Sequence, residues 1–249
     1  MTIKTGQLRK DSFTLENYAK LFQSSSAYKP YLVSIAYSLL AALVVAVICI
    51  AVARIVTKLK HKWDKLYEPF ILIPWLLPST MIALGLMMTY DEARLNLANK
   101  ILVATPVILL VAYIVIKIPF SYRMTRAAFI SLDGNMEEAA QVMGAKPFYT
   151  MRKVILPVIM PVVISVIVLN FNSLLSEYDL SVFLYHPLFQ PLGIVIKMAT
   201  DETATTEAQA MAFVYTVILM IISTIALWLG RYGGIETVKK IFRKRGKTA

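Results

Sequence analysis

Long apolar runs separated by short charged connections dominate the sequence. A helix that crosses a bilayer needs roughly 20 mostly apolar residues at about 1.5 Å rise each. Five runs meet this requirement, at about residues 33–56, 69–89, 101–121, 154–173 and 208–230. Prolines interrupt the second run at Pro74 and Pro78 and the fourth at Pro157 and Pro161, which predicts kinks because proline lacks a backbone donor. The pattern therefore predicts an all-α membrane protein with five spanning helices.

Basic residues gather beside the ends of alternate runs. One group follows the first run, another lies between the third and fourth runs, and a third follows the last run: Arg54, Lys58, Lys60, Lys62 and Lys65; Arg123, Arg126, Lys146, Arg152 and Lys153; Arg231, Lys239, Lys240, Arg243, Lys244, Arg245 and Lys247. The connections at residues 91–100 and 174–207 hold three basic residues against seven acidic ones. Because cytoplasmic connections are enriched in Lys and Arg, the basic groups are predicted to face the cytoplasm. Residues 1–30 then form an outer-face segment without a cleavable signal peptide, and residues 233–249 a basic cytoplasmic tail.

Composition narrows the function classes. The chain is 58% hydrophobic and 16% charged, against about a quarter charged in soluble domains. The net charge of +11 comes with no nucleic-acid motif, so no nucleic-acid partner is expected. The single cysteine, Cys49, lies in an apolar run and predicts neither a disulfide framework nor a metal cluster. The sequence lacks a nucleotide-binding Gly-x-x-x-x-Gly-Lys-Ser/Thr loop, a His-Glu-x-x-His motif and a Gly-x-Ser-x-Gly motif, which disfavours an ATPase or a membrane-embedded enzyme and leaves a transport subunit or a passive scaffold.

The polar stretch EEAAQVMGAKPFYTMRKVILP, residues 137–157, carries the strongest local signals. Asn135 is placed to cap a helix whose first turn holds two glutamates, where the helix dipole favours carboxylates. Gly144 can take the left-handed conformation that ends a helix. Pro147 suits the first turn of a second short helix over residues 148–153. The stretch therefore predicts a helix, a tight bend and another short helix.

This stretch resembles the EAA loop of ABC importer permeases. Glu138-Ala139-Ala140, Gly144 and Leu156-Pro157 have the spacing of that loop, with Val154 where Ile is usual. Over residues 13–230 the chain is similar to the binding-protein-dependent permease superfamily, which implies a MetI-like transmembrane domain in the bacterial inner membrane. The family docks this loop, as a coupling helix, on an ABC ATPase. The residues that the resemblance implies at the docking surface are Glu137, Glu138, Ala139, Ala140, Met143, Gly144, Ala145, Pro147, Phe148 and Arg152.

The resemblance also implies the partners of the chain. They are an ABC ATPase dimer, which binds ATP and Mg²⁺, a second permease chain or half, an extracytoplasmic solute-binding protein, and membrane lipid. No catalysis and no cofactor are expected in this chain. In the family a first helix usually precedes a stretch like residues 13–18, FTLENY, so that helix is expected to be missing, through a split or fused permease or a late start codon. Thr14 with Glu16 and Asn17 is expected to cap a short helix over residues 15–22 at the outer interface.

Polar residues near the spans are candidates for a solute pathway or gate, because polar groups in a bilayer are costly. Asn170, Ser173 and Glu177 have the spacing of one helical face. The alternative is that they form hydrogen bonds between helices or, for the acid, lie in water. The further candidates are Ser79, Asp179 and His186.

Residues 176–196 are too interrupted by proline and glycine to span, and they predict a re-entrant or interfacial element. The segment resembles the ferric-iron and 2-aminoethylphosphonate subgroup of permeases, most closely the iron permeases. Ferric iron is therefore the expected solute, with 2-aminoethylphosphonate, polyamine, thiamine or another small solute as alternatives. No metal site is expected in this chain, because in such systems the binding protein recognises the solute.

Overall fold

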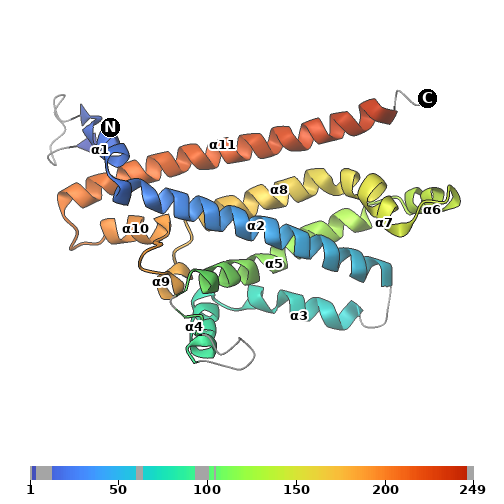
Figure 1. The fold of residues 1–249 in the computed structure, drawn as a ribbon, viewed down its shortest axis with the longest axis horizontal. Coiled ribbons are helices and arrows are strands. Elements are labelled where there is room, and N and C mark those ends of the chain that lie inside the picture. Colours follow the sequence, from blue (N-terminus) through green and yellow to red (C-terminus); the bar gives the residue numbers. More distant parts are fainter. Residues whose placement is uncertain (1, 4–12, 60–63, 93–100, 104, 246–249) are drawn as a thin grey trace. The chain divides into compact units, whose positions relative to one another are not determined.

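The computed structural model describes residues 2–3, 13–59, 64–92, 101–103 and 105–245, and these residues are almost entirely helical (Figure 1). The chain divides into two compact units. The first comprises residues 1–41, 77–113 and 171–225, and the second comprises residues 42–76, 114–170 and 226–249. Four long helices contribute residues to both units: α2 (Ser25–Leu59), α5 (Pro106–Ile130), α8 (Leu156–Leu175) and α11 (Thr206–Arg245).

Four helical stretches in the described part of the chain are long and apolar enough to cross a membrane: Ser25–Lys58, Pro106–Ile130, Pro147–Leu175 and Thr206–Gly233. They correspond to the first, third, fourth and fifth predicted runs. The second run, predicted as one span, is instead broken into α3 (Asp64–Leu76) and α4 (Ser79–Tyr90). Pro78 between them is extended, at φ −56° and ψ 140°. Its ring lacks a backbone donor and disfavours a helical conformation at the preceding residue, which accounts for the end of α3. A fifth span exists only if this broken pair is counted as one.

The first unit contains the short elements of the chain. The strands β1 (Thr2–Ile3) and β2 (Phe13–Thr14) pair antiparallel and precede α1 (Glu16–Gln23). The short helix predicted over residues 15–22 is thus present, but Leu15 is its N-terminal flanking residue and no side chain caps it. The interrupted segment forms two short helices, α9 (Ser181–Leu184) and α10 (Leu192–Ala199), neither of which is long enough to span.

The core of the first unit joins α1, α2, α10 and α11. Leu21, Tyr31, Leu192, Val214 and Tyr215 are buried together. The Tyr31 hydroxyl donates to the backbone oxygen of Tyr215 at 3.0 Å, which satisfies a buried polar group.

The second unit packs the C-terminal part of α2 against α5 and α8. Its buried residues include Val45, Cys49, Tyr122, Phe129 and Ile159. Between α5 and α8 the chain forms α6 (Asn135–Val142), α7 (Pro147–Thr150) and a π-helical turn, η3 (Met151–Ile155), which leads directly into α8. This unit therefore contains the whole of the stretch that resembles the EAA loop.

Candidate functional site

The bend between α6 and α7, which we call the elbow, is built by local sequence chemistry. The Asn135 backbone N–H donates to the Asp133 carboxylate at 3.0 Å, and α6 begins at Asn135. The prediction that Asn135 caps this helix is therefore wrong. Asn135 is the first helical residue, and the side chain of Asp133 accepts the hydrogen bond from its N–H. Glu137 and Glu138 lie in the first turn, where the helix dipole favours their charge.

Gly144 ends α6 as predicted. Its φ of 79° is in the left-handed region, where a side chain is disfavoured. Its N–H donates to the Gln141 oxygen at 2.8 Å, and the N–H of Ala145 donates to the Ala140 oxygen at 3.0 Å. This pair of hydrogen bonds is a Schellman motif, which satisfies carbonyls that a helix end would leave unpaired.

Pro147 begins α7, as predicted, but the second helix does not stop near residue 153. It continues through the π-helical turn η3 into α8. Pro157 explains the turn, because its ring crowds the carbonyl four residues earlier and that carbonyl belongs to Lys153, inside η3. The elbow is therefore continuous with a long membrane helix.

The elbow presents apolar side chains to solvent. Val142 is 88% exposed, Met143 82%, Phe148 77% and Tyr149 57%. We call these four residues the elbow patch. Exposed apolar patches of this kind mark sites of protein–protein or membrane interaction. Arg152 and Lys153, one turn beyond Phe148 and Tyr149, are exposed and basic.

A shallow groove adjoins the patch. Its volume is about 520 Å³, and it is lined by Ala140, Met143, Gly144, Ala145, Lys146, Tyr149 and Val154. Small residues form much of this lining, which allows a second backbone to approach closely. Ala140 is only 4% exposed, so the first of the two helices rests on the bundle by its small side chain.

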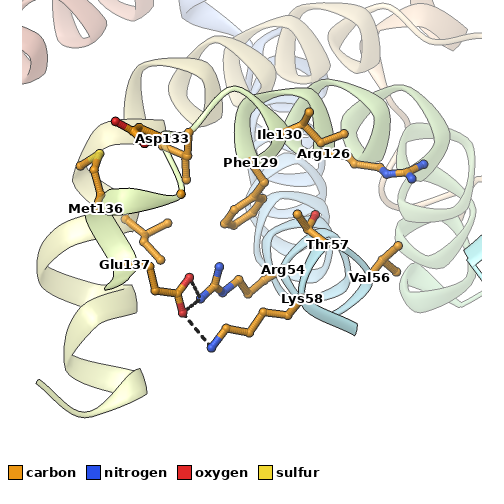
Figure 2. A pocket seen from close by; sticks show the side chains of 13 residues that line it. Arg54, Val56, Thr57, Lys58, Arg126, Phe129, Ile130, Asp133, Met136 and Glu137 are labelled. Atoms are coloured by element: carbon orange, nitrogen blue, oxygen red, sulfur yellow. Dashed lines mark hydrogen bonds and ion pairs between the residues drawn. The ribbon is translucent and has the colours of Figure 1, made fainter. Parts of the chain in front are cut away.

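Glu137 points toward Arg54 and Lys58 of α2 (Figure 2). Both of its carboxylate oxygens accept hydrogen bonds from Arg54 Nη2 at 2.7 Å, and Lys58 Nζ lies 2.8 Å from Oε1. Burial raises the pKa of Glu137, but the hydrogen bonds and charges of Arg54 and Lys58 outweigh it, so the pKa is lower than the ordinary 4.5. Glu137 was expected at the docking surface; the structure instead pairs it within the chain.

A cavity of about 560 Å³ adjoins the Glu137 cluster, and Figure 2 shows its lining side chains. Its charged members are Arg54, Lys58, Arg126, Asp133 and Glu137, and the remaining lining is largely apolar. Arg126 forms an ion pair with Glu68. The basic groups of this cavity thus already have carboxylate partners.

The pathway candidates are divided between the two units, with Asn170 in the second and the others in the first. Asn170 is 2% exposed and donates to the Ser121 hydroxyl at 2.7 Å, as the hydrogen-bonding alternative predicts. Since α8 ends at Leu175, Glu177 lies beyond the helix, and the predicted common face of Asn170, Ser173 and Glu177 is wrong. The Glu177 carboxylate accepts the Leu180 N–H at 3.2 Å.

The other candidates lie in the first unit. Ser79 begins α4, and Ser173 and Asp179 are exposed. His186 accepts the Leu188 N–H on Nδ1 at 3.1 Å and stacks near Phe189. Sequence reasoning missed the Arg54 and Lys58 contacts, because both residues were read only as markers of membrane orientation.

Comparison with known proteins identifies the family. Residues 50–232 match the profile described as "Binding-protein-dependent transport system inner membrane component". A probable ABC transporter permease protein, y4fN of Sinorhizobium fredii, is 32% identical over 212 residues, which are 85% of this chain and 37% of that protein. This chain thus spans little more than a third of that relative. A putative 2-aminoethylphosphonate transport system permease protein, PhnV of Salmonella choleraesuis, is 23% identical over 88% of this chain and 82% of that protein.

Solved structures share the fold. A bacterial ABC transporter involved in the import of the acidic polysaccharide alginate matches with a TM-score of 0.75 at 18% identity, over 90% of this chain and 85% of that one. The methionine ABC transporter MetNI in an inward-facing conformation matches with a TM-score of 0.68 at 17% identity, over 90% of this chain and 99% of that one. Because the family profile covers most of the chain, this protein belongs to the family of binding-protein-dependent transport system inner membrane components.

Proposed function

We propose that the elbow is the docking site for a cytoplasmic ATPase, and that the chain imports a small oxyanion together with a second permease chain or half and an external binding protein. The elbow patch carries this proposal. Met143, at 82% exposed, lies outside the candidate membrane spans, and Phe148, at 77%, lies in the first turn of the stretch Pro147–Leu175. A protein partner at this end of the stretch would cover both side chains. Exposed Arg152 adds a basic rim that suits an acidic partner surface.

The proposed mechanism follows from the continuity of α7, η3 and α8. When the ATPase dimer closes on ATP, a docked elbow is displaced with it. Because α7 leads without a break into α8, the displacement is transmitted to a membrane helix. The permease pair then alternates between outward-facing and inward-facing states while ATP and Mg²⁺ remain on the ATPase.

The solutes named for two relatives support the proposal that this chain imports an oxyanion. The Salmonella choleraesuis relative is named for 2-aminoethylphosphonate. A relative from Prototheca wickerhamii, a probable sulfate transport system permease protein, is 27% identical over 58% of this chain and 59% of that protein. Phosphonate and sulfate are both tetrahedral oxyanions. Ferric iron, expected from the resemblance of residues 176–196, is the competing solute.

Uptake measurements test the solute. A strain that lacks the permease is complemented with wild type or with Gly144→Trp, and the uptake of radiolabelled 2-aminoethylphosphonate, sulfate and ferric iron is measured. We expect wild type to restore uptake of 2-aminoethylphosphonate or sulfate, and Gly144→Trp to abolish it while membrane insertion persists. Restored uptake of iron alone would contradict the oxyanion assignment.

Co-purification tests the docking separately. The cognate ATPase should be retained by wild type and lost from Gly144→Trp, whose side chain blocks both the left-handed bend and the groove. Equal retention by both would refute docking at the elbow, and absence of any ATPase with wild type would favour a passive scaffold.

The proposed orientation places the elbow in the cytoplasm. In a Cys49→Ser background, a cysteine at Glu92 should react with an impermeant maleimide in intact cells, and a cysteine at Glu138 only after permeabilisation. The reverse labelling pattern would overturn this orientation.

A further inference from the structure

Glu137 and Glu138 are adjacent in α6 but have different surroundings. Glu137 has a side chain that is 21% exposed and contacts Arg54, whose side chain is 18% exposed. Glu138 is exposed, and no ion pair among the described residues involves it. Successive helical residues point about 100° apart, so the two carboxylates serve different faces.

The inward face of α6 contains one buried side chain and one ion-paired carboxylate. Ala140, one turn after Glu137, is the buried residue of this helix, and its small side chain supplies little contact area. Glu137 supplies the polar attachment, since it accepts hydrogen bonds from Arg54 on both carboxylate oxygens. Lys58 lies one turn after Arg54 on α2 and adds a second cation to the same carboxylate.

The cluster does not have the charge balance of an anion site. Arg54 and Lys58 already face Glu137, and Arg126 already faces Glu68. An anion that entered the adjoining cavity would have to displace a carboxylate. Arg54 and Lys58 are therefore better explained as residues that hold Glu137 in place.

We infer that Glu137 is a positioning residue that fastens α6 to the C-terminal end of α2, so that a displacement of the elbow is carried directly into α2 as well as into α8. This inference rests on the proposed function, in which a partner displaces the elbow. Glu138 then remains free to meet the partner. The permease would thus receive the ATPase motion on two membrane helices, one through chain continuity and one through an ion-pair contact.

A distance measurement on the full chain in nanodiscs tests this inference. In a Cys49→Ser background, nitroxide labels are attached at Ile55→Cys on α2 and Gln141→Cys on α6, both exposed positions. Their distance distribution is recorded by pulsed electron paramagnetic resonance, with the isolated chain and with the cognate ATPase trapped by ATP and vanadate. Glu137→Gln is compared with Glu138→Gln as the matched control, and Lys58→Gln serves as a milder variant.

With Glu137 intact, we expect one narrow distribution that is the same in both states, because α2 and α6 move together. Glu137→Gln should broaden it in the isolated chain and shift its mean when the ATPase is trapped. Lys58→Gln should broaden it less, and Glu138→Gln should leave it narrow while weakening ATPase retention.

Three results would overturn the inference. These are a distribution in Glu137→Gln as narrow as in wild type, a shift on trapping in wild type, and broadening in Glu137→Gln without any shift on trapping. If wild type retains no ATPase, the proposed function fails, and the comparison of isolated chains alone decides whether Glu137 fastens α6.

Discussion

Phe148 offers the sharpest test of the elbow patch, because the chain contains a matched control. Phe148 is 77% exposed in the elbow, and Phe22 is 74% exposed on α1 in the other unit. Each is replaced by alanine. The two substitutions remove the same side chain from equally exposed positions, so any difference in ATPase binding reports the position and not the chemistry of the residue.

The magnitude follows from the area still available for burial. A buried aromatic side chain covers about 150 Å² or more. With 77% of Phe148 still exposed, about 115 Å² remains to be buried in an interface. At about 25 cal/mol per Å² this corresponds to about 3 kcal/mol, an upper bound. Alanine retains part of the contact, so a loss of about 2 kcal/mol, or roughly a 30-fold rise in Kd, is expected.

Surface plasmon resonance with the permease in nanodiscs and the cognate ATPase as analyte measures this change. Phe148→Ala should raise Kd by roughly 30-fold, mostly through faster dissociation. Phe22→Ala should leave Kd within about twofold, since it lies far along the chain from the elbow. The assignment of the elbow patch is refuted if Phe148→Ala also stays within twofold or if both variants weaken binding equally.

Three further predictions concern packing and charge. Gly193→Ala should lower the free energy of unfolding, followed by thermal denaturation, by about 1–3 kcal/mol, because its Cβ would lie 2.7 Å from a backbone oxygen. Gly85→Ala, whose Cβ would have no atom within 4 Å, should not lower it. Asn170→Ala should lower the free energy of unfolding by about 1–3 kcal/mol, and a double-mutant cycle with Ser121→Ala should show that the two decreases are not additive. The folded-state pKa of Glu137 is lowered, so the contribution of this carboxylate to stability is complete above the ordinary value of 4.5 and is lost only as the pH falls below it. The distribution of distances between the labels on α2 and α6 should therefore stay narrow at pH 4.5 and broaden only at lower pH.

Features fixed by local backbone chemistry could be predicted from the sequence. Gly144 and Pro147 act through their own dihedral angles, so their roles at the elbow are independent of distant residues. The fate of other prolines could not be predicted in this way. Pro78 breaks the second run, whereas Pro157 is accommodated by a π-helical turn, so a proline within an apolar run does not by itself predict which of the two forms.

Contacts between distant residues had no local signal. Glu137 and Arg54 are 83 residues apart, and Asn170 and Ser121 are 49 apart. The basic residues at the end of the first run are typical of a membrane-flanking group, and that role alone accounts for them in sequence. Only the fold shows that Arg54 and Lys58 face the same carboxylate. The expectation that Glu137 lies at a docking surface took no account of these two cations, with which the structure pairs its carboxylate.

A docking helix transmits force only if it is held by its own bundle about as firmly as by its partner. In the proposed docking, the elbow patch offers the ATPase apolar anchors, of which Phe148 alone would contribute about 2–3 kcal/mol. Within the chain, a hydrogen bond to a charged group contributes about 1.5–3 kcal/mol, and the single Nη2 nitrogen of Arg54 donates to both carboxylate oxygens of Glu137 at 2.7 Å. The partly buried position of this pair also reduces its screening by salt. The two attachments are thus of similar strength, which is the condition under which an ATPase that pulls on α6 moves α2 instead of detaching the helix.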